Sequence, residues 1–197
     1  QGKIYCESNP FLSCAIKELN KKFNSKIVVF LRSPKSIVKS LHVKGFYSHN
    51  FNRSNSCKAP GLSADVNISY TFGRIIPTGE EEFDAWNALT HIGKVSWWFK
   101  TCVNDIINQL EQINKSEYQI IDNADFFDYE KLNVLCDFIG FDNSLSEKKF
   151  NKIFKSKPGA ASRKQKINDP LSHWSDLEKS EFDIMTSESI SKLISLK

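Results

Sequence analysis

Arg32 and Ser40 are the residues whose types and spacing could do chemistry together. Arg32 follows the apolar run Ile27 to Leu31, and Ser40 comes eight residues later, beyond Ser33 and Pro34. The run is typical of a buried strand, and Ser followed by Pro is typical of a helix N-cap and first helical residue. A guanidinium and a hydroxyl beside a helix N-terminus can bind phosphate, since open backbone N–H groups add donors. The alternative is an Arg paired with an acid and a Ser facing solvent.

The elements that must position these two residues alternate between strands and helices. A strand-like segment at 3–8 precedes a helix that opens at Pro10, and the strand at 27–31 precedes a helix that opens at Pro34. This order predicts parallel strands joined by right-handed crossovers. Ligands of such sheets bind outside the carboxyl ends of the strands, which is where Arg32 is expected.

The rest of the sequence has a mostly helical pattern. The predicted elements are a helical region at 78–114 that Gly93 could divide, a buried strand at 118–122, a helix ending at Gly140, a short helix at 146–155 and an amphipathic helix at 177–196. Within the first region, Trp97 and Trp98 could stack on a ligand. At helical spacing, however, a core and rim position is the favoured interpretation.

Two segments lack a sustained period. Residues 47–80 are rich in Asn, Ser, Gly and Pro, which indicates an ordered functional loop, a lid or a surface insertion. A basic loop that contains Arg163 and Lys164 follows the short helix at 146–155. We expect a single domain over 1–197 with the loop insertion at about 47–80.

Composition narrows the function classes. Of the 197 residues, 40% are hydrophobic and 12% aromatic, which excludes a globally disordered chain. A formal charge of +4 permits an anionic ligand but gives no argument for a nucleic-acid partner. Five scattered cysteines without a CxxC pair argue against a zinc site or a disulfide framework, and favour a reducing compartment such as the cytoplasm.

Other sequence features concern localisation. Three glycosylation acceptor patterns, at Asn52, Asn67 and Asn114, keep the Golgi or secretory lumen as the alternative. No apolar run approaches the roughly 20 residues of a membrane span, and no signal peptide is visible. Because the sequence opens on Gln1 and enters strand-like sequence at once, we expect that an N-terminal portion was processed off or left out.

The segment FLRSPKSIVKS resembles the 3′-phosphate-binding motif of sulfotransferases that use 3′-phosphoadenosine 5′-phosphosulfate. That motif consists of a strand, an Arg (here Arg32), a Pro two residues on (Pro34) and a Ser eight residues after the Arg (Ser40). YQIIDNADFF, NVLCDFIGF and the basic loop with Trp174 follow in the family's order. The resemblance therefore extends from Tyr5 to about Glu178, apart from the insertion.

The resemblance implies a P-loop-NTPase-like, three-layer α/β/α fold with a parallel sheet and a helical C-terminal half. It implies that Arg32 and Ser40 hold the 3′-phosphate and that Arg163 and Lys164 reach it from the C-terminal loop. The family's phosphosulfate loop is missing, since the sequence has neither a Pro-Lys/Arg-Ser-Gly-Thr-Thr run nor a Gly-x-x-x-x-Gly-Lys run. We therefore expect a domain without its first strand, loop and helix, which would lie before Gln1.

The implied reaction transfers a sulfuryl group to a hydroxyl or amine acceptor, for example on a carbohydrate or protein, and leaves adenosine 3′,5′-bisphosphate. No metal is expected. Family members use a His or a Glu as general base, and the acid nearest the Pro10 helix is Glu7. Alternatively, Glu7 helps to cap that helix. His42 and His49 flank the start of the insertion and could contact the acceptor.

Two other hypotheses fit the same residues. One is a non-catalytic nucleotide- or glycan-binding module that kept the phosphate-binding residues and lost the phosphosulfate loop. The other is a nucleoside or nucleotide kinase of related topology, which the missing loop and the lack of an arginine-rich lid disfavour. The acceptor class and the oligomeric state stay open at this point.

Overall fold

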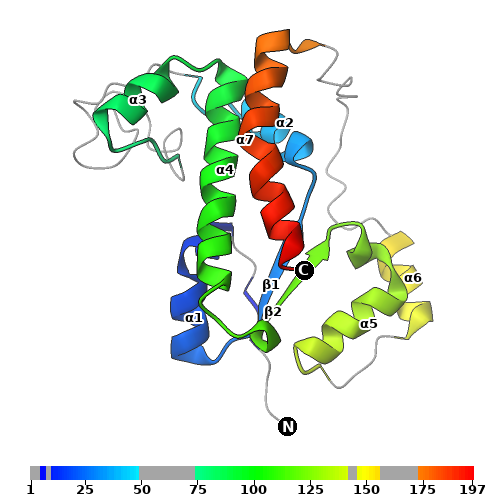
Figure 1. Ribbon diagram of the computed structural model, residues 1–197. Coiled ribbons are helices and arrows are strands. Elements are labelled where there is room, and N and C mark those ends of the chain that lie inside the picture. Colours follow the sequence, from blue (N-terminus) through cyan, green and yellow to red (C-terminus); the bar gives the residue numbers. More distant parts are fainter. Residues whose placement is uncertain (1–4, 8–9, 49–73, 142–145, 156–172) are drawn as a thin grey trace. The chain divides into compact units, whose positions relative to one another are not determined.

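The computed structural model describes residues 5–7, 10–48, 74–141, 146–155 and 173–197 (Figure 1). These residues are mostly helical and include one parallel sheet of two strands, so the α/β class is confirmed. They divide into two compact units, which are described separately: residues 1–32, 110–168 and 197 form the first, and residues 33–109 and 169–196 form the second. The single domain with an insertion stays a prediction, and residues 49–73 of that insertion lie outside the described residues.

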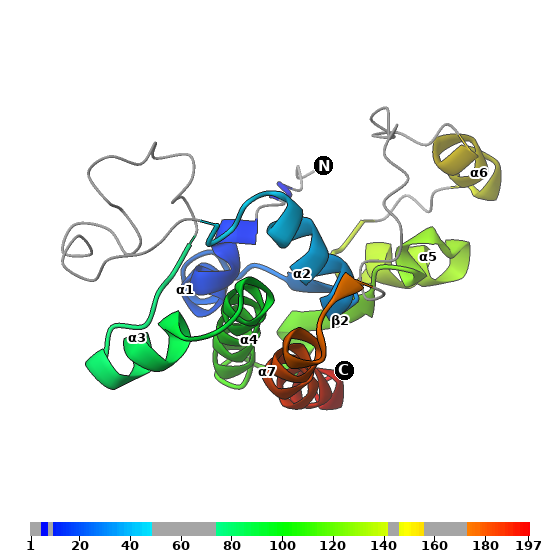
Figure 2. The ribbon, with the colours of Figure 1, turned by 90° about the horizontal axis from the view of Figure 1, so that it is seen from above.

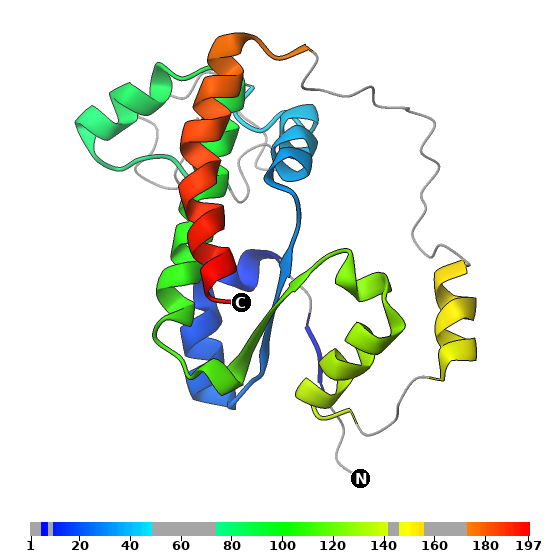
Figure 3. The same cartoon turned by 45° about the vertical axis from the view of Figure 1, so that its right-hand side comes forward.

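The sheet of the first unit consists of β1 (Ile27–Leu31) and β2 (Tyr118–Asp122), which Figure 3 shows side by side in blue and green. Both strands have the bounds predicted from their apolar runs. They pair in parallel, with Ile27 opposite Tyr118 and Leu31 opposite Asp122. The N–H of Asn123 donates a 2.7 Å hydrogen bond to the carbonyl of Leu31, which joins the carboxyl ends of the strands.

Helices of the first unit precede and follow these strands. They are η1 (Pro10–Ala15), α1 (Ile16–Phe23), η4 (Lys115–Glu117), η5 (Asp125–Phe127), α5 (Tyr129–Phe138) and α6 (Glu147–Lys155). The helix predicted at Pro10 thus opens as a 3-10 helix. Asp128 caps α5, because its side chain accepts from the N–H of Lys131, and Gly140 with φ of +76° ends the segment as predicted.

The strand predicted at residues 3–8 is not found at the described part of that segment. Residues 5–7 are irregular, and Tyr5 is 85% exposed. A strand needs a neighbour to take its backbone hydrogen bonds, and the described residues pair only β1 with β2. The apolar residues of this segment therefore do not by themselves form a strand.

The second unit contains α2 (Pro34–Val43), α3 (Glu80–Asn87), α4 (His91–Leu110) and α7 (Asp176–Ser195). Figures 1 and 2 show α4 and α7 side by side. The core residues of α4 recur every three or four positions: Ile92, Val95, Phe99, Val103 and Ile107 are all buried. Val38 of α2 and Leu193 of α7 are buried as well. The helical periodicity seen in the sequence thus marks the core of this unit.

Gly93 does not divide two helices. It lies in the first turn of α4, and the break between α3 and α4 falls at residues 88–90. The Thr90 hydroxyl accepts a 3.0 Å hydrogen bond from the N–H of Gly93, so Thr90 begins the helix as a cap. Glu181 of α7 accepts from the N–H of Thr90 at 3.2 Å. A side chain at position 93 would place its Cβ 2.2 Å from a Glu181 carboxylate oxygen, which explains the glycine.

Within the described residues, no helix combines the length and the apolar character needed to cross a membrane.

Candidate functional site at the carboxyl end of the parallel strands

Arg32 lies directly after β1, at the carboxyl end of the sheet in the first unit. Its side chain is exposed and makes no ion pair or hydrogen bond with any residue that the structure describes. On the adjacent strand, Asp122 lies opposite Leu31, one position before Arg32. A carboxylate is therefore present at the same edge of the sheet. The carboxylate of Asp122, however, binds Lys197 and not Arg32. The guanidinium of Arg32 is therefore available to an anionic ligand.

A chain of alternating charges follows the end of β2. Lys197 Nζ lies 2.6 Å from Oδ2 of Asp122 and 3.5 Å from Oδ2 of Asp125. Lys131 Nζ lies 2.5 Å from Oδ1 of Asp125. The hydrogen bond from Lys131, together with the positive charge of Lys197, lowers the pKa of Asp125. The contact with Asp125 raises the pKa of Lys131, and the contacts with Asp122 and Asp125 raise the pKa of Lys197, so Asp125, Lys131 and Lys197 stay charged at neutral pH.

Ser40 belongs to the second unit, on α2. Val38 is fully buried there, and Ser40 is half-buried. The N–H groups of Ser36 and Ile37 donate to the carbonyl of Ser33 at 3.0 and 3.1 Å, so these two donors are occupied at the helix start. Ser33 is the N-cap residue, but its side chain makes no capping hydrogen bond. Since Arg32 and Ser40 fall in different units, the phosphate-binding pair stays a prediction.

The remaining predicted site residues are Glu7, Arg163 and Lys164. Glu7 is exposed and accepts a 2.8 Å hydrogen bond from the Tyr5 hydroxyl, which raises the pKa of Tyr5. Its role as general base stays a prediction. Arg163 and Lys164 of the basic loop lie outside the described residues, and so does His49.

His42, one of the two histidines that the sequence suggests as acceptor contacts, forms a pair with His91 in the second unit, and no sequence signal indicates this pairing. The rings of His42 on α2 and His91 on α4 lie 4.3 Å apart between centroids. His91 Nε2 contacts the carbonyl of Phe46, whereas Nδ1 of His42 is buried and has no hydrogen-bond partner among the described residues. Burial and the nearby His91 lower the pKa of His42, and Glu178 opposes them. The pair therefore favours the neutral form of His42.

Trp97 and Trp98 both pack against aromatic rings of the second unit, and neither is fully buried. Trp97 packs edge-on against Trp86 at 6.1 Å between ring centroids, and Trp98 packs in the same way against Phe46 at 5.7 Å. Both are half-buried. Their contacts are therefore with other aromatic rings of the unit, which favours a packing role.

The basic residues that meet at the end of β2 were also missed. A local signal existed for Lys131, which lies six positions beyond Asp125 and three beyond the helix cap Asp128. Lys197 had no such signal, since 75 positions separate it from Asp122. Among the described residues, no group of three or more His, Cys, Asp or Glu side chains could hold a metal ion.

Comparison with protein-family models, with curated proteins and with solved structures finds no match for this chain. The functional assignment therefore depends on the residues and geometry of the chain itself.

Proposed function

We propose that this chain is a sulfotransferase domain that binds the 3′-phosphate of 3′-phosphoadenosine 5′-phosphosulfate through Arg32. In this proposal the parallel pair β1 and β2 is part of a P-loop-NTPase-like, three-layer α/β/α fold. The reaction would transfer a sulfuryl group to a hydroxyl or amine of an acceptor such as a carbohydrate or a protein. The acceptor class is left to experiment.

The observation that carries the proposal is the state of the Arg32 side chain. It is exposed at the carboxyl end of a parallel strand, the edge where α/β proteins bind ligands, and makes no ion pair with a described residue. Asp122, opposite Leu31 on β2, already binds Lys197, and Asp125 of η5 binds Lys131 and Lys197. A planar guanidinium without a carboxylate partner suits bidentate binding of a phosphate.

The other residues have the roles that the sulfotransferase resemblance implies. Ser40 would donate its hydroxyl to the 3′-phosphate, and Arg163 and Lys164 would neutralise that phosphate from the C-terminal loop. When bound, the donor supplies the sulfuryl group. Glu7 would accept the proton of the acceptor hydroxyl or amine as the oxygen–sulfur or nitrogen–sulfur bond forms and the bond from sulfur to the leaving phosphate oxygen breaks. Arg32, Arg163 and Lys164 would keep the 3′-phosphate in place during the transfer.

The experiment is thermal unfolding of the chain with adenosine 3′,5′-bisphosphate, compared with adenosine 5′-phosphate. The bisphosphate should raise the unfolding temperature because it binds the folded state alone, and the monophosphate should raise it less. Arg32→Ala should abolish the difference. Lys21→Ala, which removes an exposed positive charge on α1, should preserve it. The absence of a shift in the wild type at millimolar bisphosphate would disprove the proposed site.

A second candidate function is a non-catalytic nucleotide- or glycan-binding module. The observation that favours it is the lack of a Gly-, Ser- and Thr-rich phosphosulfate loop in the 197 residues. Sulfuryl transfer from labelled donor to a panel of hydroxyl and amine acceptors separates the two. Transfer that Glu7→Gln depresses, with bisphosphate binding kept, supports the enzyme. Binding without transfer to any acceptor supports the module.

A further inference from the structure

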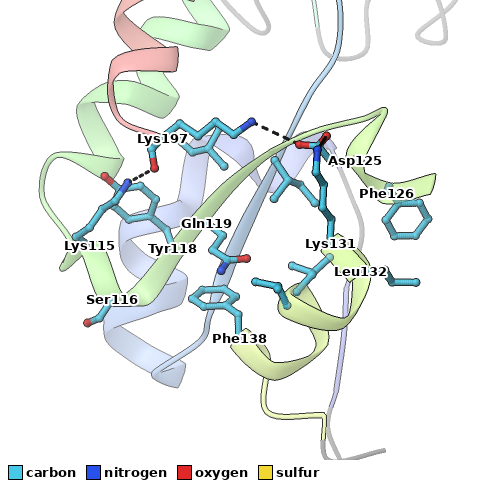
Figure 4. A pocket seen from close by; sticks show the side chains of 14 residues that line it. Lys115, Ser116, Tyr118, Gln119, Asp125, Phe126, Lys131, Leu132, Phe138 and Lys197 are labelled. Atoms are coloured by element: carbon cyan, nitrogen blue, oxygen red, sulfur yellow. Dashed lines mark hydrogen bonds and ion pairs between the residues drawn. The ribbon is translucent and has the colours of Figure 1, made fainter. Parts of the chain in front are cut away.

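A cavity of about 500 Å³ lies along one edge of β2 in the first unit (Figure 4). Its described lining includes four consecutive residues of β2, 118–121, and none of β1. Side chains of consecutive strand residues point to opposite faces, so a cavity that touches all four lies beside the strand. Because β1 pairs with one edge of β2, the cavity lies at the other edge. Its volume falls within the range of about 300–1,000 Å³ that is usual for small-molecule sites.

The backbone of Ile120 faces this cavity. The N–H of Asn123 bonds to Leu31 of β1, and successive backbone groups of a strand point alternately to its two edges. The N–H and C=O of Ile120, three residues earlier, therefore point away from β1. No hydrogen bond from another described residue reaches these two groups, although Ile120 is only 4% exposed. Because an unpaired donor and acceptor on a buried residue are costly, they are suited to bind a ligand.

The wall of the cavity that α5 contributes is apolar. Leu132, Leu135 and Phe138 recur every three positions along this helix, and all three line the cavity. Leu135 is buried, whereas Leu132 and Phe138 are half-buried and keep apolar surface open to a ligand. A flat ring that covers these two side chains would remove that surface from water, which favours binding.

The charged groups of the lining already have partners. Asp125 lies 2.5 Å from Lys131 and 3.5 Å from Lys197, and Lys197 also lies 2.6 Å from Asp122. The ammonium of Lys115 donates a 3.1 Å hydrogen bond to the carbonyl of Lys197. A charged ligand would lose its hydration on binding, and groups that already have partners compensate for little of that loss. The lining therefore favours an uncharged ligand.

We propose that this cavity binds a small, uncharged, flat ring compound that carries a lactam, in which a ring N–H and a C=O are adjacent. The lactam N–H donates to the carbonyl of Ile120, and the lactam C=O accepts from the N–H of Ile120. The ring covers Leu132 and Phe138. A lactam satisfies both backbone groups at once, whereas a ring with an acceptor alone leaves the Ile120 carbonyl unpaired. The site is separate from Arg32 and does not depend on the sulfotransferase proposal.

The test uses quinolin-2-one and its N-methyl derivative, which has the same rings and carbonyl but no N–H. Binding is followed by backbone amide chemical shifts of the whole chain. We expect quinolin-2-one to move the amide proton of Ile120 downfield. It should bind about tenfold or more tightly than the N-methyl derivative, which leaves the Ile120 carbonyl unpaired. Naphthalene-2-carboxylate, an anion of similar size, should also bind more weakly than quinolin-2-one.

Matched variants separate the cavity from other apolar surface. Leu132→Trp places a larger side chain in the cavity and should weaken quinolin-2-one binding about tenfold or more. Leu177→Trp makes the same change on α7, where Leu177 is 61% exposed, and should leave the affinity unchanged.

The wild-type comparison decides the proposal even where Leu132→Trp fails to fold. Equal affinity for quinolin-2-one and its N-methyl derivative, tighter binding of the carboxylate, or an Ile120 amide that does not move would overturn it. So would sedimentation showing that a second copy of the chain pairs with this edge of β2 and excludes quinolin-2-one.

Discussion

Leu31 and Asp122 are register partners at the carboxyl ends of β1 and β2, and a 2.7 Å hydrogen bond from the N–H of Asn123 to the carbonyl of Leu31 closes this end of the ladder. Arg32 follows Leu31 directly, so the backbone that bears its guanidinium starts from a paired strand. Because Asp122, the acid at the end of β2, binds Lys197, the guanidinium of Arg32 is exposed to solvent and accessible to a ligand.

Gly93→Ala should destabilise the protein, although Ala is the better helix former by about 1 kcal/mol. The new Cβ would lie 2.2 Å from a carboxylate oxygen of Glu181, so the carboxylate must move away from the N–H of Thr90. We expect a loss of about 1–3 kcal/mol in the free energy of unfolding, measured by urea denaturation. In a Glu181→Ala background the same change should become stabilising. An unchanged sign there would show that Glu181 is not the obstacle.

Stability should fall as the pH is lowered below about 6.5, the ordinary pKa of histidine. Burial lowers the pKa of His42 in the folded state, so below pH 6.5 the unfolded chain binds a proton that the folded chain resists. The contribution of His42 is therefore fully present above this pH and is lost as the pH falls. Urea denaturation at several pH values from neutral to mildly acidic measures it.

His42→Gln should make this acid-side loss of stability smaller than in the wild type. His173→Gln, at an exposed position, should leave the loss as it is. Identical pH profiles for the wild type and His42→Gln would show that another group causes the loss.

The carboxyl of Asp125 should titrate below its ordinary range, as followed by ¹³C NMR of the side chain. Lys131→Gln should move the midpoint upward, because the hydrogen bond from Lys131 is the largest cause of the lowered pKa of Asp125. Lys179→Gln removes the partner of Asp176 on α7 and serves as the control. It should leave the Asp125 midpoint where it is. A midpoint that Lys131→Gln does not move would exclude the 2.5 Å contact in solution.

Two isoleucine truncations test the core of the second unit. Ile92 is 0% exposed on α4, whereas Ile184 is 68% exposed on α7. Ile92→Ala should cost about 2–5 kcal/mol of unfolding free energy, since it leaves a cavity. Ile184→Ala should change that free energy by no more than about 0.5 kcal/mol. Equal costs in chemical denaturation would contradict the burial of α4.

The parts of the fold that local sequence determines were predicted well. Both strands and the start of α2 at Pro34 follow from an apolar run with polar flanks and from a proline at a first helical position. Phe23 shows the limit, because helical spacing places it on an apolar face and the structure leaves it 63% exposed. Spacing gives the periodicity of a face, but only tertiary partners decide whether each position is covered.

The candidate site, too, was predictable only where its residues lie in one short segment of the sequence. Arg32 could be recognised because one short segment contains its strand, its helix start and Ser40. The contacts of Lys197 and the cavity beside β2 and α5 could not be predicted, because they depend on segments that are distant in sequence and meet only in the fold. Glu181 and Gly93 are another such pair, on α7 and α4.

The central claim is that Arg32 binds a nucleotide 3′-phosphate, and calorimetric titration tests it most directly. Adenosine 3′,5′-bisphosphate and adenosine 5′-phosphate are each titrated into the wild type and Arg32→Ala. We predict that the wild type prefers the bisphosphate by about tenfold or more and that Arg32→Ala loses this preference, because the guanidinium contacts the additional phosphate. A preference of the same size in both proteins, or none in the wild type, would contradict the claim.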